Sequence, residues 1–254
     1  MPLFTDGPPS EMADLTAQDT QLLNMTSVEG IDVTQKLRLA QDELSLELSA
    51  MLEGSYYADA AFWLPAQATI SNVVVTPALK LWHTYRTLEL VYREAYSNQL
   101  NDRYKANRDQ FQDRAKWAYE KLVQLGIGMC RCPLPQAAIP MVVCAPGNLP
   151  DGTYYAAMAW INEACEEGTP SVLTTFTTSG GTLLVQPTST PTYANAWNVY
   201  LGVSPESMSL QNESPIVAGQ TWLQPDAVGA GGRAPGYGQS PNYTKPVPRM
   251  ILRG

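Results

Sequence analysis

The sequence predicts an α+β multidomain protein, in which an N-terminal antiparallel helical bundle is followed by a C-terminal antiparallel β-sandwich. In the first half, apolar residues recur at spacings of three and four, which is typical of amphipathic helices. After residue 150, apolar and polar residues alternate along short segments separated by turn residues, which is typical of antiparallel strands. With 254 residues and a hydrophobic content of 44%, the chain is long enough for two cores.

The longest expected helical stretch runs from residue 76 to 126. Thr76 and Pro77 suit the N-cap and the first helical position, and Gly126 suits the left-handed position after the last turn. No glycine or proline interrupts residues 78–125, but weak helix formers predict a bend near 98–102. A second helix is expected over residues 32–54 and a short one over 19–25, whereas residues 1–18 are expected to be mobile.

Five prolines between residues 133 and 150 predict an extended linker between the halves, although residues 139–143 could begin a strand. Beyond it, strands are expected over 153–161, 171–177, 182–186, 198–202 and 208–211. The expected organisation is a helical domain (1–131), a proline-rich linker (132–150), a β-sandwich domain of fibronectin or immunoglobulin type (151–232) and a basic C-terminal tail (233–254).

The net charge of −8 is divided into blocks of alternating sign. Residues 1–60 carry eleven acids and two bases, and residues 132–232 carry seven acids and no base. Residues 61–131 and 233–254 each have a net charge of +4. Such blocks indicate either surfaces that meet different partners or simply solvated faces. Both signs are mixed along residues 93–121, which argues against sequence-specific DNA binding.

Several classes of function find no support in the sequence. We find no phosphate-binding loop, dinucleotide fingerprint or zinc-protease motif, and His83, the only histidine, is interpreted as structural. We therefore expect no enzyme, no catalytic residue, no cofactor and no metal. The four cysteines lack zinc-ribbon spacing, so reduced thiols are expected, with a zinc site or a disulfide as alternatives. The chain has no apolar run of membrane-spanning length and no export signal, which predicts a cytoplasmic protein without a membrane contact.

Two stretches are candidate interaction surfaces. The first is an aromatic-rich connection that either packs on the helices or forms a subunit interface; its residues are Tyr56, Tyr57, Phe62 and Trp63. The second is an apolar run flanked by arginines near residue 254, formed by Arg249, Met250, Ile251, Leu252 and Arg253. This run either docks on a partner, by strand addition or in an apolar groove, or completes the sheet of the β domain.

Residues 76–129 resemble the helical core of the head-to-tail connector proteins of tailed bacteriophages, also called adaptor or neck proteins. The resemblance lies in a long helix lined with tyrosine and leucine, the turn at Asn101–Tyr104 and a second helix that runs into residues 126–128. The second half resembles the fibronectin type III and immunoglobulin-like domains that phages attach to virion proteins. The matching residues there are 152–155, 166–171 and 197–202.

The resemblance implies a structural virion protein of the neck, assembled in the host cytoplasm. It would form a homo-oligomeric ring, typically a dodecamer, beneath the portal protein, and would also meet tail, nozzle or tail-completion proteins. Genomic DNA would pass through the lumen without sequence-specific binding. The alternative is a non-enzymatic carbohydrate- or surface-binding module of a tail or cell-wall protein, because exposed Trp and Tyr can stack on sugars. An enzyme ranks third.

Overall fold

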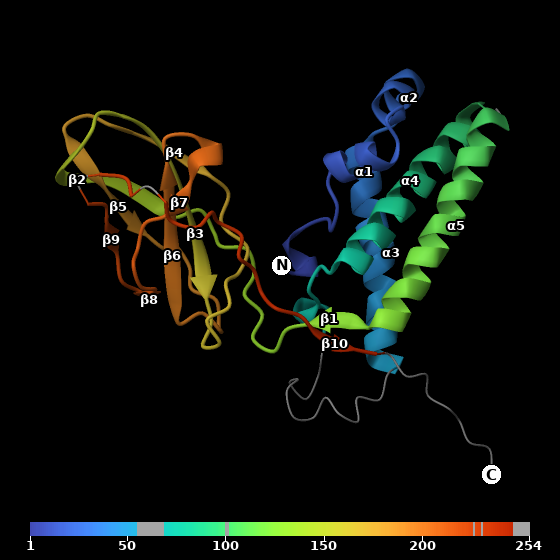
Figure 1. The fold of residues 1–254 in the computed structure, drawn as a ribbon. Coiled ribbons are helices and arrows are strands. Elements are labelled where there is room, and N and C mark those ends of the chain that lie inside the picture. Colours follow the sequence, from blue (N-terminus) through green and yellow to red (C-terminus); the bar gives the residue numbers. More distant parts are fainter. Residues whose placement is uncertain (55–68, 100–101, 226, 230, 246–254) are drawn as a thin grey trace, which may run out of the picture. The chain divides into compact units, whose positions relative to one another are not determined.

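A computed structural model describes the chain except residues 55–68, 100–101, 226, 230 and 246–254 (Figure 1). The chain forms two compact units. The first, the β unit, consists of Met1–Asp6 and Cys132–Ser240, and the second, the helical unit, consists of Gly7–Arg131 and Pro241–Gly254. Among the described residues, five α-helices precede antiparallel sheets, which confirms the predicted α+β class.

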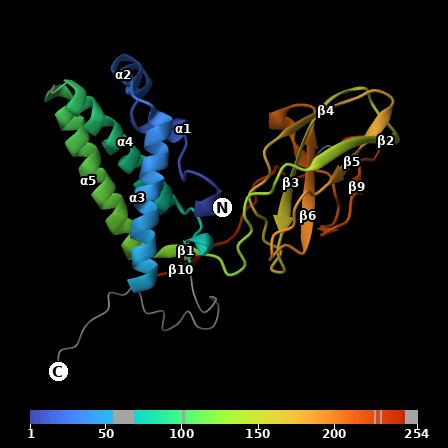
Figure 2. The ribbon, with the colours of Figure 1, turned by 180° about the vertical axis from the view of Figure 1, so that it is seen from behind.

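The helical unit is built on three long helices, α3 (Val33–Gly54), α4 (Pro77–Gln99) and α5 (Asp102–Leu125). Helix α4 packs against both of the others (Figures 1 and 2). Helices α4 and α5 run side by side, whereas α3 is inclined to them and diverges from α5 at the end near α2. Two short helices, α1 (Met12–Gln18) and α2 (Leu22–Glu29), also contact α4. The helix in residues 12–18 corrects the expectation that residues 1–18 are mobile.

Both ends of the α4–α5 hairpin follow the predicted cap chemistry. The Thr76 hydroxyl oxygen accepts a hydrogen bond from the Leu79 amide at 3.4 Å, at the start of α4. Gly126 has φ +101° and its N–H donates to the Leu122 carbonyl at 2.8 Å, at the end of α5. The expected break near residues 98–102 is also present, because α4 ends at Gln99 and α5 begins at Asp102.

The predicted apolar faces of the long helices form the core of the helical unit. Leu44 and Leu48 of α3, Leu88 of α4 and Leu122 of α5 are at most 1% exposed. The rings of Tyr92 and Phe111 stack at a centroid distance of 5.6 Å. Burying each such side chain contributes about 1.5–3 kcal/mol before ordering costs, so packing rather than helix propensity stabilises the unit.

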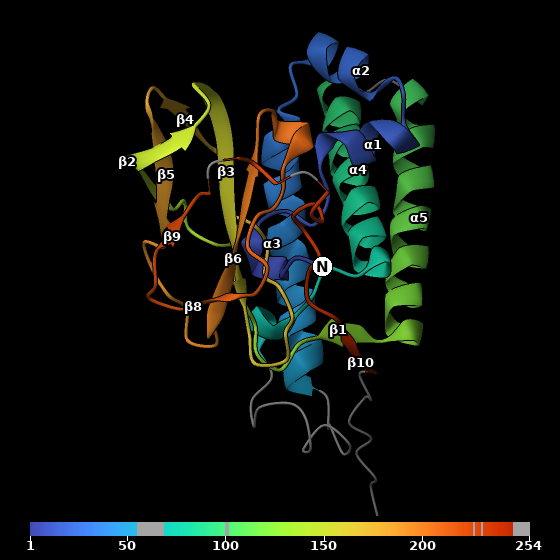
Figure 3. The same cartoon turned by 60° about the vertical axis from the view of Figure 1, so that its left-hand side comes forward.

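The β unit contains two antiparallel sheets (Figure 3). In the larger sheet β3 (Gly152–Ile161) lies between β4 (Thr174–Thr178) and β6 (Ala196–Gly202), and β6 also pairs with β7 (Ser209–Leu210) and β8 (Ile216–Val217). In the smaller sheet β5 (Gly181–Gln186) lies between β2 (Met141–Leu149) and β9 (Trp222–Leu223). One apolar cluster draws on both sheets, with Met158, Trp160, Trp197 and Val199 from the larger and Val185 from the smaller.

The structure differs from the expected linker at residues 132–150. Met141–Leu149 is strand β2, and Met141 to Ala145 pair in regular register with β5. The strand tolerates Pro146 because β2 is an edge strand and its register shifts between Ala145 and Leu149, so no ladder hydrogen bond requires the missing N–H there. Residues 1–6 also belong to this unit: the Asp6 carboxylate accepts hydrogen bonds from the Gln136 amide at 2.8 Å and the Thr169 hydroxyl at 2.6 Å.

The expected tail at residues 233–254 is likewise divided between the units. Residues up to Ser240 belong to the β unit, and the chain then returns to the helical unit. There β10 (Asn242–Thr244) pairs antiparallel with β1 (Ile127–Met129), which directly follows α5. The figures show this two-stranded sheet beside the ends of α3 and α5. The helical unit is therefore made of two segments that are far apart in the sequence.

Candidate binding groove of the helical unit

The two interaction surfaces predicted from the sequence lie outside the described residues. This holds for the aromatic set Tyr56, Tyr57, Phe62 and Trp63, and for the apolar run Arg249, Met250, Ile251, Leu252 and Arg253. Both remain predictions. The described residues offer a different candidate, a groove over α4 between α3 and α5, which the sequence analysis did not identify.

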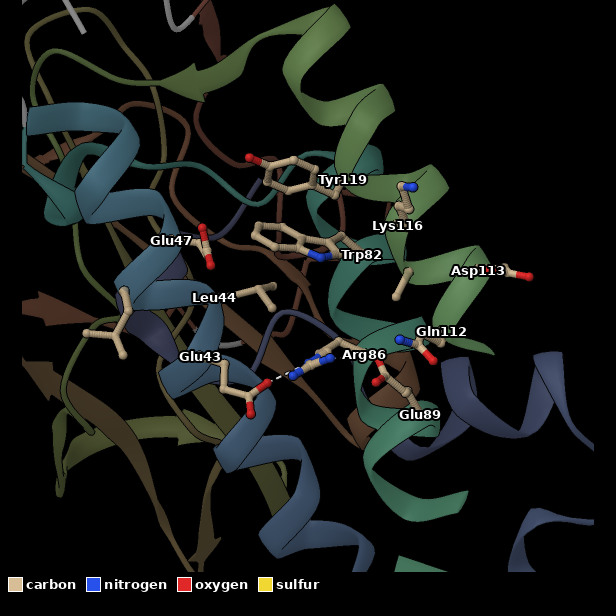
Figure 4. Close-up of a pocket in the computed structure, with 12 residues that line it drawn as sticks. Glu43, Leu44, Glu47, Trp82, Arg86, Glu89, Gln112, Asp113, Lys116 and Tyr119 are labelled. Atoms are coloured by element: carbon tan, nitrogen blue, oxygen red, sulfur yellow. Dashed lines mark hydrogen bonds and ion pairs between the residues drawn. The ribbon is translucent and has the colours of Figure 1, made fainter. Parts of the chain in front are cut away.

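The groove has a volume of about 680 Å³ and is lined by one face from each long helix (Figure 4). Helical periodicity explains why these residues share a face, because the lining residues of α4 and α5 follow spacings of three and four. Helix α4 contacts both neighbours, so its face forms the floor between two walls. The lining residues are Glu43, Leu44, Leu46, Glu47, Trp82, Arg86, Glu89, Gln112, Asp113, Ala115, Lys116 and Tyr119.

A chain of ion pairs crosses the floor of the groove. The Arg86 guanidinium donates from Nε to Glu43 at 2.5 Å and from a terminal nitrogen to Glu89 at 2.6 Å. Glu89 also accepts from Arg93 at 2.5 Å. The Glu89 side chain is only 2% exposed, so its charge depends on these two arginines rather than on water. This network ties α3 to α4 and fixes the position of the charges under the groove.

The remaining lining residues are mixed. Apolar surface comes from both helical walls and from Trp82, whereas Glu47, Gln112, Asp113 and Lys116 are polar or charged. Trp82 and Tyr119 meet edge to face at a centroid distance of 5.1 Å, and Leu46 of α3 is 73% exposed. Within the described part of the chain, Glu47 and Asp113 form no ion pair. The lining carries four carboxylates and two cations, so its formal charge is −2. A groove with apolar rings and this charge suits a ligand that carries apolar and basic side chains.

His83 lies in the same helix but is part of the core. Its side chain is fully buried; Nε2 lies 3.0 Å from the Leu37 carbonyl oxygen and Nδ1 lies 2.6 Å from the Ser10 hydroxyl. A carbonyl oxygen can only accept, so Nε2 carries the proton and neutral Nδ1 accepts from Ser10. The imidazole therefore connects the N-terminal segment, α3 and α4. Burial lowers the pKa of His83 to about 4, although the Leu37 carbonyl and Asp14 act in the opposite direction.

Acid is expected to destabilise the helical unit through His83. The pKa is about 4 in the folded protein and about 6.5 unfolded, so the unfolded state binds more protons between these values. Stability present above pH 6.5 is thus lost as the pH falls towards 4, by at most about 3 kcal/mol. Urea unfolding at pH 7 and pH 4.5, with His83→Gln as the matched variant, measures this loss. Gln can keep both hydrogen bonds without titrating, so equal losses in the two proteins would contradict the assignment.

The β unit contains a second buried carboxylate, Glu167, which joins residues distant in sequence. Its side chain is 1% exposed and accepts from the Tyr200 hydroxyl at 2.7 Å, the Asn198 amide at 2.8 Å and Arg233 at 2.5 Å. Burial and the neighbouring Glu167 raise the pKa of the Tyr200 hydroxyl. Among the described residues, the hydrogen bonds of the Glu167 carboxylate all go to protein side chains. They connect Arg233 of the expected tail to Asn198 and Tyr200 of β6.

The sequence was compared with models of known protein families and with curated proteins. No model of a known protein family matches the chain, and no curated protein matches it in sequence. Among the described residues, no three His, Cys, Asp or Glu side chains are grouped so that they could hold a metal ion. None of the described helices is both long and apolar enough to cross a membrane.

Proposed function

We propose that the chain is a structural protein of a tailed-phage virion, the head-to-tail adaptor that forms a dodecameric ring beneath the portal protein. The ring connects capsid to tail, meets tail, nozzle or tail-completion proteins, and lets genomic DNA pass without sequence-specific binding. The proposal rests on the resemblance of residues 76–129 to connector proteins. It also includes the finer architecture, in which the long helices form an antiparallel bundle and the two sheets form a β-sandwich.

The observation that carries the proposal is the return of the chain to the helical unit at β10. Thr244 pairs with Ile127, so residues 246–254 leave from a fixed point next to the end of α5. A docking arm needs such a firm attachment, because an anchored arm loses less entropy when it binds a partner. The apolar run from Met250 to Leu252 and its flanking arginines supply the side chains for docking on the portal protein.

The alternative, a carbohydrate- or surface-binding module, has less support. Its sequence argument relied on aromatic side chains of the β domain being exposed. The two large tryptophans of the core, Trp160 and Trp197, are at most 1% exposed. Tyr193 and Tyr237 are 43% and 73% exposed, and the guanidinium of Arg233 lies 4.8 Å from the Tyr237 ring. Buried tryptophans cannot stack on a sugar. The proposal of an adaptor is therefore preferred, and it includes the absence of enzymatic activity.

Deleting residues 246–254 is expected to weaken binding to the portal protein while both units stay folded. The deletion leaves β10 intact and removes three apolar side chains that would each contribute about 1.5–3 kcal/mol to docking before ordering costs. Surface plasmon resonance on immobilised portal rings should show at least about a tenfold loss of affinity. As a charge control, Arg38→Ala/Lys105→Ala removes two exposed cations and should keep the affinity. Undiminished binding by the truncated protein would refute the docking arm.

A further inference from the structure

The groove between α3 and α5 has features that match a segment of the same chain. We propose that, in the free protein, this groove binds the chain's own residues 246–254, which lie outside the described residues. The inference does not depend on the proposed function, since it concerns the protein without any portal and is tested in its absence. Three observations carry it: where the segment starts, how far it reaches, and the chemistry of both surfaces.

The segment starts beside the end of α5, and the groove lies near the middle of the three long helices. Strand β10 runs antiparallel to β1, so it leads the chain back towards the end of α5. A Cβ atom on Gly126 would lie 3.0 Å from the Thr244 carbonyl oxygen, which places the end of β10 directly beside the residue that follows α5. Tyr119 in the groove wall is only seven residues before Gly126, about 10 Å along the helix axis.

The segment is long enough to cover the groove. Nine extended residues span about 30 Å. Gln112, the lining residue of α5 farthest from Gly126, is fourteen residues away, or about 21 Å along the helix axis. Pro246 and Pro248 also disfavour helix in the first half of the segment, which favours an extended chain. Residues 249–253 can therefore reach Trp82 and Tyr119 in the groove.

The chemistry of the segment complements that of the groove. Residues 249–253 place three adjacent apolar side chains between two arginines, without an acid. The groove offers the rings of Trp82 and Tyr119. Its lining also includes Glu47 and Asp113, which form no ion pair among the described residues, and one further cation, Lys116. Arginine at the border can pair with these acids while the apolar residues cover the floor. Docking would thereby remove exposed apolar surface from water.

A photo-crosslinker in the segment tests the proposal in the full-length protein. Benzoylphenylalanine replaces Ile251, the free protein is irradiated, and mass spectrometry locates the adducts. We expect adducts within one chain, on residues 43–47 or 112–119. The same group at Val203, an exposed position of the β unit, serves as the control and should not label these residues. Adducts confined to other surfaces, or adducts that link two chains, would overturn the proposal, the latter by identifying a second copy as the occupant.

Charge variants of the groove, used in the same crosslinking experiment, test whether its carboxylates contribute to binding of the segment. Glu47→Gln/Asp113→Asn removes the two unpaired carboxylates while preserving side-chain shape, and should reduce the yield of groove adducts severalfold. The matched control is Asp42→Asn/Glu53→Gln, which removes two exposed acids of α3 that do not line the groove and should leave the yield unchanged. Circular dichroism verifies that both variants fold. Equal yields in both variants would overturn the assignment of the acids.

Discussion

Trp160→Ala is expected to unfold the β unit under conditions in which the helical unit stays folded. The Trp160 side chain is 1% exposed, lies opposite Trp197 in the β3–β6 register and packs in the cluster shared by both sheets. Removing a buried indole costs about 3–5 kcal/mol through lost transfer energy and the cavity left behind. Since a domain is stable by only about 5–15 kcal/mol, this change removes a large part of the stability of the β unit.

Hydrogen exchange measured by mass spectrometry distinguishes the two units in this variant. Amides of β3 and β6 should lose about a hundredfold or more of their protection, because each 1.36 kcal/mol corresponds to a factor of ten. Amides of α4 and α5 should keep theirs. The control is Trp117→Ala, which removes the same side chain from a position that is 48% exposed and should change stability by less than about 0.5 kcal/mol. An equal loss of protection in α4 would mean that the chain unfolds as one cooperative unit.

Glu89→Ala is expected to destabilise the helical unit by about 3 kcal/mol. The Glu89 carboxylate is buried and bonded to Arg86 and Arg93, and removing one partner of a buried pair leaves an uncompensated charge. Arg86 suffers most, because its side chain is 26% exposed whereas that of Arg93 is 51% exposed and can regain water. Urea unfolding followed by helical circular dichroism measures the loss.

Glu94→Ala provides the matched control for this prediction. Glu94 lies in the same helix and forms an ion pair with Lys36, but its side chain is 36% exposed. Such exposed pairs contribute only about 0–1 kcal/mol, because water and salt screen them. If Glu89→Ala destabilised the protein no more than Glu94→Ala, the floor network would not have the structural role assigned to it.

The helices could be predicted from the sequence because their signals are local. The spacing of Leu44 and Leu48, the cap at Thr76 and the glycine at 126 each act within a few residues, and the structure bears them out. The candidate groove could not be predicted in this way. The groove depends on α4 packing between α3 and α5, and nothing in any one helix specifies that arrangement.

The strands also show that local sequence signals do not determine every element. The long alternating run of β3 predicts a strand. The prolines around β2 predict a linker in which only residues 139–143 could begin a strand. Proline excludes a strand only from the middle of a sheet, and edge position is a tertiary property. The pairing of β10 with β1 joins Thr244 to Ile127, and such three-residue strands carry too little pattern to reveal a contact between distant segments.

The proposal that this chain forms an adaptor ring on a portal is tested most directly by mass. Sedimentation velocity or mass photometry on the purified protein, alone and mixed with purified portal rings, measures it. We predict that the mixture contains a stoichiometric complex in which about twelve copies join one portal ring, the number that the resemblance to connector proteins implies for a ring that closes on itself. A protein that persists as a monomer of 27.8 kDa and never joins the portal would contradict the proposal.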